Sequence, residues 1–256
     1  MATLYTLNSL DGSLFILDSS AGGVSTFATM REATASGGIS TSSSRSNITF
    51  VGNMPGRGGG TLVIQRNYYA FNTSGITGTV ASVDFEIYGY GTGTGRHIGV
   101  KSTAFGGDGA SSLSTGDWDA ISGWDHDAEA EGNVTDYTTV YNAASGADGW
   151  TASGYNSFTG TSALKTDMQN EDVVIICLMN YNYDYKYESG VTLPSSGTIE
   201  SIIGYYTEQS GTSNDPRLNY TLGAAGYANT VKGVAAANIG KVMGVATANI
   251  SKVNGI

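Results

Sequence analysis

The stretch ASVDFEIYGY, residues 81–90, decides the fold class. Apolar side chains occupy every second position at Val83, Phe85 and Ile87, and the residues between them are polar. Successive side chains of a strand point to opposite faces, so this pattern places all three apolar residues on one face. A period of two with one polar face is typical of a half-buried antiparallel strand. The stretch therefore predicts one strand of an antiparallel sheet.

Similar short runs, rich in β-branched and aromatic residues and bounded by glycine or polar turns, recur on both sides. They are Thr61–Phe71, His97–Phe105, Asp172–Glu188, Thr198–Glu208 and Leu218–Leu222. Residues 34–47 are rich in Ser, Thr and Gly and are expected to form a loop. Helix formers follow the N-cap candidates Thr161 and Ser162, which predicts one or two helical turns over Thr161–Met168. Regularly spaced strands with almost no helix predict an all-β fold, and we expect a two-sheet antiparallel jelly-roll β-sandwich.

The composition narrows the class of function. The chain has 256 residues with 12 Lys and Arg against 22 Asp and Glu, a net charge of −10. Such an acidic chain does not attract a phosphate backbone, so we expect no nucleic-acid partner. No apolar run is long enough for a transmembrane helix, and the first residues lack the basic and apolar regions of a signal peptide. We therefore expect a protein made in the cytoplasm, without membrane insertion.

The chain offers few groups for catalysis or metal binding. With only His97 and His126, a multi-histidine metal site is not expected, and no phosphate-binding glycine loop or nucleophile elbow occurs. Cys177 lies in the apolar run VVIICLM and is expected to be a buried structural thiol. The acids Asp117, Asp119, Asp125 and Asp127 are expected to belong to a solvated loop. The sequence predicts no enzyme, no cofactor and no metal site.

Two stretches resemble a known family of β-sandwich domains. RNYYAFNTSGITGTVASVDFEIYG, from Arg66 to Gly89, is similar to the start of DNRLRE-type domains, in which an Arg-led strand is joined to a later strand across a Ser-x-Ile turn. GTSNDPRLNYTL, from Gly211 to Leu222, resembles the last strand of that family. The resemblance covers about residues 60–222 and implies a domain like a carbohydrate-binding module, of a kind found on cell surfaces and phage particles. The pattern consists of core and turn positions, so it specifies the fold better than the function.

The C-terminal segment repeats with a period of eleven residues. VKGVAAANIGK (231–241) is followed by VMGVATANISK (242–252) and then VNGI (253–256). As a helix the repeat places Val231, Val234, Asn238, Ile239 and Val242 on one face, but its glycines disfavour a helix. An extended strand that interleaves with neighbouring subunits is the alternative, and both conformations remain open.

Neither conformation buries the apolar residues of this tail within one chain, so the repeat predicts a docking or oligomerisation segment. The candidate assembly residues are Val231, Val234, Asn238, Ile239, Val242, Val245, Asn249 and Ile250. The repeat is similar to C-terminal repeats of structural proteins of aquatic bacteriophages. That resemblance implies a virion protein with other virion proteins as partners, and a homo-oligomer, with a trimer preferred.

Four alternating tyrosines, Tyr181, Tyr183, Tyr185 and Tyr187, end the strand predicted over Asp172–Glu188. On one strand all four rings would face the same side and form a platform that stacks on sugar rings. The alternative is that they extend the core, because Val173, Ile175, Cys177 and Met179 share their face.

Trp118 and Trp124 are candidate glycan-binding residues in a loop with His126 and several acids, including Asp119 and Asp125. Exposed tryptophan beside acids suits a glycan site, with or without calcium, although the spacing matches no EF-hand loop. The alternative is that both rings fasten a long loop to the sandwich.

We divide the chain into an N-terminal arm or first strands (1–50), a β-sandwich domain (51–222) and a repeat tail (223–256). The predicted function is a bacteriophage virion structural protein, a capsid decoration, fibre or tail component, whose domain attaches to host-surface glycans. The alternative is a carbohydrate-binding module or adhesin of a bacterial surface or polysaccharide-degrading system.

Overall fold

The computed structural model describes residues 1–7, 10–19, 24–41, 44–56, 59–125, 132–144, 149–186, 194–207, 211–223, 241–242 and 245–246. Its strands and α-helices are β1 (Ala2–Tyr5), β2 (Asp11–Asp18), α1 (Val24–Arg31), β3 (Gly38–Ser40), β4 (Arg45–Gly56), β5 (Gly59–Asn72), β6 (Val80–Gly93), β7 (Arg96–Lys101), β8 (Tyr141–Asn142), β9 (Tyr155–Thr159), α2 (Ser162–Asn170), β10 (Val173–Asn180), β11 (Ile199–Tyr205), β12 (Arg217–Leu222), β13 (Lys241–Val242) and β14 (Val245–Ala246). Short 3₁₀ turns at Phe105–Gly107 and Thr115–Asp117 and a π-helical turn at Tyr181–Tyr185 complete the described elements.

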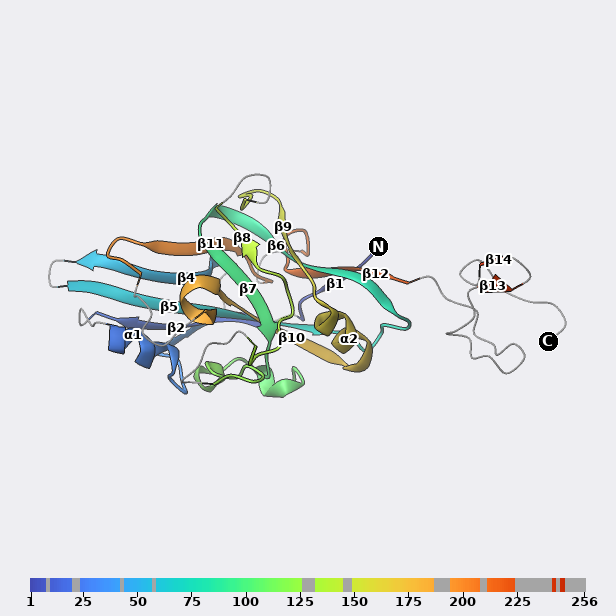
Figure 1. The fold of residues 1–256 in the computed structure, drawn as a ribbon, viewed down its shortest axis with the longest axis horizontal. Coiled ribbons are helices and arrows are strands. Elements are labelled where there is room, and N and C mark those ends of the chain that lie inside the picture. Colours follow the sequence, from blue (N-terminus) through green and yellow to red (C-terminus); the bar gives the residue numbers. More distant parts are fainter. Residues whose placement is uncertain are drawn as a thin grey trace.

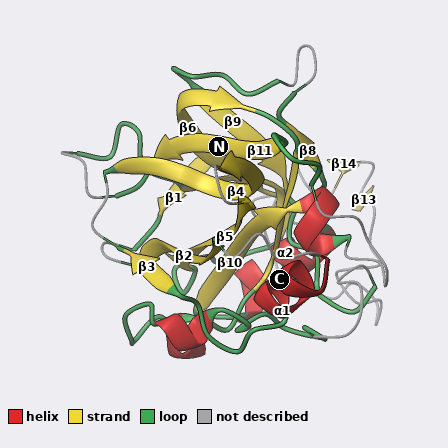
Figure 2. Cartoon of the chain, turned by 90° about the vertical axis from the view of Figure 1, so that its left-hand side faces the viewer, coloured by secondary structure: helices red, strands yellow, loops and turns green. Residues whose placement is uncertain are grey.

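The described strands pair antiparallel throughout and form one curled sheet, apart from the small β13–β14 pair. Its main path runs β1-β12-β6-β11-β4-β5-β10-β7-β8 (Figure 1). Off this path, β2 pairs with β5, β3 pairs with β2, and β9 pairs with β6. Because the sheet curls, β6, β9 and β11 come to lie above β2, β5 and β10 in Figure 2. The prediction of a mostly antiparallel all-β protein is confirmed.

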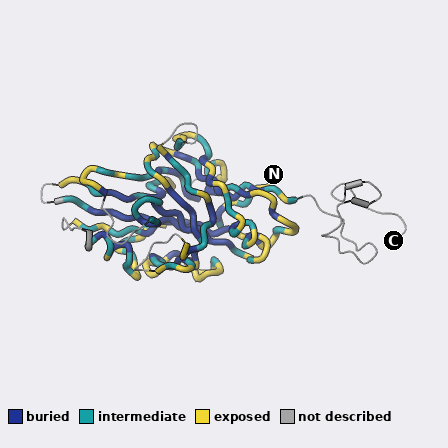
Figure 3. The backbone as a smooth tube through the Cα atoms, viewed as in Figure 1, coloured by how far each residue is buried: buried dark blue, intermediate teal, exposed yellow. Residues whose placement is uncertain are grey.

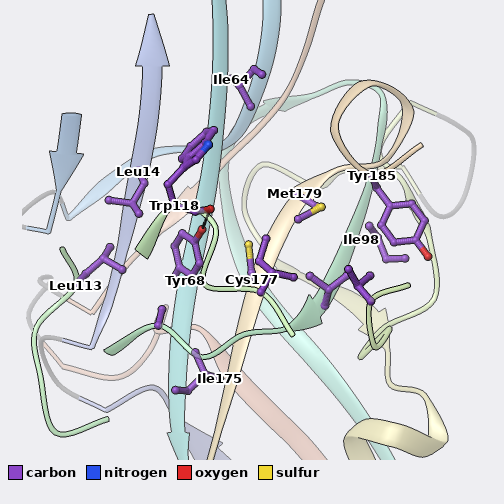
Figure 4. Close-up of a cluster of buried hydrophobic side chains, with 14 of the residues drawn as sticks. Leu14, Ile64, Tyr68, Ile98, Leu113, Trp118, Ile175, Cys177, Met179 and Tyr185 are labelled. Carbon is purple, nitrogen blue, oxygen red and sulfur yellow. Dashed lines mark hydrogen bonds between the residues drawn. The ribbon is translucent and has the colours of Figure 1, made fainter. Parts of the chain in front are cut away.

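Two neighbouring strands, β5 and β10, have both faces covered. Leu62, Ile64 and Tyr68 of β5 belong to one buried cluster, with Cys177 of β10, whereas Tyr69 belongs to a second cluster on the other face. Figure 4 shows part of the first cluster, with Tyr68 and Cys177 between Trp118 and Ile175. A strand covered on both faces needs a nearly continuous apolar sequence. The core therefore lies on both sides of these strands. Figure 3 shows the centre of the molecule as a dark, buried tube.

The strand β6, whose alternating sequence indicated the fold class, buries the face that the sequence predicts. Val83, Phe85 and Ile87 are buried in the second cluster, and β6 pairs with both β12 and β9. Glu86 points to the opposite, outer face, yet it is only 7 % exposed because Arg217 of the neighbouring strand covers it. The helix predicted at Thr161 is also confirmed, since the Thr161 side chain accepts a hydrogen bond from the Leu164 N–H.

The first 50 residues contribute strands to the sheet. β1 pairs with β12, β2 pairs with β5, and β4 lies between β5 and β11. The expectation of a loop over residues 34–47 is wrong in part, because β3 and the start of β4 fall within it. Serine and threonine fit a strand well where its polar side faces water, and composition alone does not separate that case from a loop.

The strand predicted over Asp172–Glu188 ends early, at Asn180. The Asn180 side chain accepts a hydrogen bond from the Tyr183 N–H at 2.9 Å, and the Lys186 N–H donates to the Tyr181 carbonyl oxygen at 2.9 Å. These bonds close a π-helical turn that carries Asp184 inward to the buried Arg66 guanidinium. The prediction that Tyr181, Tyr183 and Tyr185 share one face of a strand is therefore wrong. The buried charge of Arg66 needs a partner, and this need overrides the alternating pattern.

Candidate ligand-binding surface

Four tyrosines lie side by side on the outer face of the sheet and form what we call the tyrosine row. They are Tyr155 of β9, Tyr88 and Tyr90 of β6 and Tyr205 of β11. Ring centroids are 5.2 Å apart from Tyr155 to Tyr88, 5.7 Å from Tyr88 to Tyr205 and 5.6 Å from Tyr205 to Tyr90. Interplanar angles of 87°, 70° and 81° make each contact edge-to-face, an arrangement that aromatic rings prefer. The contacts fix each ring against its neighbour.

Strand register and two glycines bring these rings together. Tyr88 is directly opposite Tyr155, and Gly89 of β6 is directly opposite Gly204 of β11, so Tyr205 lies next to Tyr88. A side chain at Gly204 would place a Cβ atom 2.8 Å from the Ile87 Cγ2 atom and 2.9 Å from the Tyr88 carbonyl oxygen. Glycine is therefore required there for β6 and β11 to approach so closely.

An arginine covers each end of the row. The Arg217 Cζ atom lies 3.5 Å from the Tyr155 ring centroid, and the Arg45 Cζ atom lies 4.0 Å from the Tyr90 ring centroid. Both distances are within the range of a cation–π contact. Tyr90 is among the exposed large side chains of the molecule, with 44 % of its surface accessible. The row is therefore open to solvent.

Glu86 holds Arg217 in place on Tyr155. The Arg217 Nε–H donates to Glu86 Oε2 at 2.6 Å, and the Ser157 hydroxyl donates to Glu86 Oε1 at 3.0 Å. Burial alone would lower the pKa of Arg217, but its bond with Glu86 and the charge of that carboxylate outweigh burial and raise the pKa. Burial raises the pKa of Tyr155 to about 12, so that ring stays neutral.

Three of the four hydroxyls are free to bind a ligand. The Tyr155 hydroxyl is used within the chain, because it donates to the carbonyl oxygens of Ser213 at 3.0 Å and Asp215 at 3.1 Å. Within the described part of the chain, the hydroxyls of Tyr88, Tyr90 and Tyr205 have no hydrogen-bond partner. The row therefore offers rigid rings with unused polar groups.

A groove of about 460 Å³ begins at the Tyr155 end of the row and follows β9. Its described walls include Thr139, Tyr141, Asn142, Thr151, Tyr155 and Thr159, and no described residue that lines it is charged. Its floor contains Phe158, whose ring centroid lies 4.6 Å from that of Tyr141.

Asn156 fixes the shape of this groove. Its Nδ2 group donates to the carbonyl oxygens of Thr151 at 3.0 Å and Gly154 at 3.2 Å, and its Oδ1 atom accepts from the Thr151 N–H at 2.7 Å. The Tyr141 hydroxyl donates to the same Oδ1 atom at 3.2 Å. One buried amide therefore ties β8, β9 and the segment before β9 together, so the walls are preformed.

The tyrosines predicted from the sequence lie elsewhere. Tyr181 and Tyr185 stack on each other in the π-helical turn, with ring centroids 5.2 Å apart, and the Tyr185 hydroxyl donates to the Asp136 carboxylate at 2.8 Å. Tyr185 is buried, and Tyr183 packs partly buried against the first core cluster. Tyr187 lies outside the described residues. The turn offers no row of exposed rings.

Trp118 and Trp124 enclose a buried arginine. The Arg66 Cζ atom lies 4.2 Å from the Trp118 ring centroid and 4.3 Å from that of Trp124, and its guanidinium makes two 2.7 Å bonds to the Asp184 carboxylate. Trp118, Arg66 and Asp184 are fully buried. The expectation of an exposed Trp118 is corrected, because its ring packs against a charge in the interior. The two rings fasten their loop to the sheet.

The remaining predictions concern metals and assembly. Among the described residues no group of three His, Cys, Asp or Glu side chains is arranged to hold a metal ion, and Cys177 is buried. His126 and Asp127 lie outside the described residues, as do the assembly candidates Val231, Val234, Asn238, Ile239, Asn249 and Ile250. Val242 and Val245 are described and pair with each other where β13 and β14 lie antiparallel, so these two residues are extended.

Sequence reasoning missed the tyrosine row and the groove. One available signal was IYGYG after the deciding strand, where two tyrosines on one face are separated by a glycine. Another was the dipeptide Tyr-Asn, which occurs at residues 141–142 and 155–156, on the two strands that form the groove, and once more at 181–182. Neither signal specifies which strands become neighbours.

Comparison with known proteins gives no match, either to a family model or to a curated protein. None of the described helices has the length and apolar character required to span a membrane.

Proposed function

We propose that this protein is a structural component of a bacteriophage particle that displays a β domain of the jelly-roll type and attaches to glycans on the host surface. The domain would be a binding module without catalytic activity. The repeat tail would anchor it to other virion proteins or to further copies of the same chain. Two resemblances of the sequence support this proposal, one to DNRLRE-type domains and one to C-terminal repeats of structural proteins of aquatic bacteriophages.

The observation that carries glycan binding is the continuous outer surface made by the tyrosine row and the groove. Sugar rings present apolar C–H faces and hydroxyl edges, so they bind where rigid aromatic rings lie beside neutral polar groups. The row supplies four rings with three unused hydroxyls. The groove supplies threonine hydroxyls and the amide of Asn142.

Attachment through such a shallow surface relies on many copies. A single site with few polar contacts binds weakly, whereas a particle that displays many copies gains affinity from high effective concentration. The eleven-residue repeat supports this arrangement because neither a helix nor a strand of this sequence would bury its own apolar residues.

Glycan binding is tested with polysaccharides extracted from bacterial surfaces and the full-length chain. We expect the chain to bind at least one of them, and we expect Tyr205→Ala to weaken that binding. Tyr183→Ala serves as control, because Tyr183 is a partly buried tyrosine outside the row. A chain that binds no surface polysaccharide would contradict this part of the proposal.

The alternative is a carbohydrate-binding module of a bacterial surface or polysaccharide-degrading system, which the same surface would serve equally well. Removal of residues 223–256 separates the two functions. Under the virion proposal, light scattering should detect an oligomer for the full chain and a monomer for the chain that ends at Leu222. Two monomers, with glycan binding retained, would favour the module.

A further inference from the structure

We infer that the ligand is an internal segment of an uncharged polysaccharide, bound lengthwise from the groove across the tyrosine row. This inference rests on the proposed glycan-binding function and adds the class of glycan. Three features of the surface support it: the charges around it, the polar groups left free on it and its length.

The charges near the groove do not suit an anionic sugar. Arg217, the cation beside Tyr155, is already bound to Glu86 and stacked on Tyr155. Arg96, which pairs across the sheet with the groove residue Asn142, stacks on Tyr181 at 4.4 Å. Asp84 lies two residues from Glu86 on the same outer face of β6 and pairs across the sheet with Thr159, a residue of the groove. A sulfate or carboxylate placed beside Thr159 would meet these two carboxylates, and the Arg217 next to them is already paired with Glu86. The net charge of −10 adds a general repulsion.

The free polar groups match hydroxyls instead. The hydroxyls of Tyr88, Tyr90 and Tyr205 can each donate and accept, as sugar hydroxyls do. Asn142 uses its Oδ1 atom to accept from the Ala144 N–H at 3.1 Å, which leaves its Nδ2 group without a partner among the described residues. Binding therefore needs only neutral hydrogen bonds and ring stacking.

The surface is longer than one sugar. Tyr155 belongs both to the groove and to the row, so the two parts are continuous, and three further rings follow it. A pocket for a terminal sugar holds one ring, whereas this surface offers several aromatic rings in succession beyond the groove. The arrangement fits an internal segment of a chain.

Arg45 would suit an anion at the far end of the row, since it covers Tyr90 without an ion pair among the described residues. It therefore provides the discriminating variant. If the glycan is neutral, Arg45→Gln should change the affinity less than twofold. If the glycan carries sulfate or carboxylate groups at that end, the same variant should weaken binding strongly.

The experiment measures binding of the full-length chain to matched neutral and sulfated polysaccharides, such as dextran with dextran sulfate and agarose with carrageenan, at low and high NaCl. We expect binding to a neutral member, little dependence on salt, about a tenfold loss with Tyr205→Ala, and no change with Tyr183→Ala. Thermal unfolding verifies that each variant is folded.

Binding only to sulfated members, with a steep loss at high salt and with Arg45→Gln, would overturn the inference and leave glycan binding intact. Binding to short oligosaccharides that equals binding to long chains would overturn the internal-segment part. Failure to bind any glycan, including the bacterial surface polysaccharides, would overturn the proposed function together with the inference.

Discussion

Arg66 and Arg217 are arranged in the same way in two different regions of the molecule. Each guanidinium stacks on aromatic rings and binds a carboxylate, Asp184 for Arg66 and Glu86 for Arg217. The first pair has no exposed side-chain surface, whereas Arg217 and Glu86 keep 23 % and 10 % of theirs. The same combination of a guanidinium, an aromatic ring and a carboxylate therefore occurs once in the interior and once beside a surface that is open to ligands.

The difference lies in what each arrangement can do. A buried ion pair is costly to break, so Arg66 and Asp184 specify how the loop of Trp118 and the turn after β10 pack. Burial alone would lower the pKa of Arg66, but Asp184 outweighs it and raises the pKa, so the guanidinium remains charged. The outer pair contributes little to stability because water screens it. Its role is to hold Tyr155 where the row and the groove meet.

The largest effect is expected at the inner pair. Asp184→Asn leaves the Arg66 charge buried without its counterion, and we expect a loss of about 3–5 kcal/mol in the free energy of unfolding. Urea denaturation measures it. The double variant Arg66→Met with Asp184→Leu should lose clearly less than the sum of the single variants. Additive losses would show that the two residues do not act as a pair.

A second buried polar contact makes stability depend on pH. The Thr49 hydroxyl hydrogen-bonds to His97 Nδ1 at 2.6 Å and His97 Nε2 bonds to the Thr94 carbonyl oxygen at 2.8 Å, and burial lowers the pKa of His97 to about 4.

Between about pH 4 and pH 6.5, His97 is therefore protonated in the unfolded chain and neutral in the folded chain. As pH falls through this window, we expect stability to fall by about 1.4 kcal/mol for each pH unit. Urea denaturation across the window measures the slope. His97→Gln should flatten it, and an unchanged slope would assign the dependence to other groups.

A substitution in the tyrosine row should have the opposite effect to one at the inner ion pair. It should weaken glycan binding and leave the free energy of unfolding nearly unchanged. Tyr205 is partly buried and contacts both Tyr88 and Tyr90, so Tyr205→Ala removes the centre of the row. We expect the dissociation constant for a neutral polysaccharide to rise about tenfold. Calorimetric titration measures the constant. A variant that unfolds before it loses affinity would make the row structural.

The smallest effect is expected at Glu86. Glu86→Gln removes the charge that holds Arg217, and we expect stability to fall by about 1 kcal/mol or less. Glycan affinity should fall a few-fold because the Tyr155 ring is less fixed. Parallel denaturation and binding measurements compare the two losses. A loss of several kcal/mol in the free energy of unfolding would show that the Glu86–Arg217 pair stabilises the fold as the Asp184–Arg66 pair does, which would contradict the contrast between them.

The sequence predicts most of the strands but not the site. Alternation over residues 81–90 depends on local geometry, so it predicts β6 and its buried face correctly. The same reasoning fails at Tyr181–Tyr185, because Arg66 lies more than a hundred residues away and pulls Asp184 inward. Alternation cannot detect a partner so distant in sequence.

The tyrosine row was missed for a related reason. Its members come from three strands that are separated along the chain by long connections. Only the register of β6 with β9 and β11 brings them together, and register follows from the whole sheet. Short motifs in the sequence show that tyrosines are exposed on a strand, but not which tyrosines become neighbours.

The most direct test of the account follows the tyrosine ring signals by NMR during titration of the full-length chain, with ¹³C-labelled tyrosine, by a neutral polysaccharide. We predict that the signals of Tyr88, Tyr90, Tyr155 and Tyr205 shift together with one dissociation constant. The signals of the buried Tyr68, Tyr69 and Tyr137 should stay unchanged. Shifts confined to other tyrosines, with the row unaffected, would contradict the claim that this surface binds the glycan.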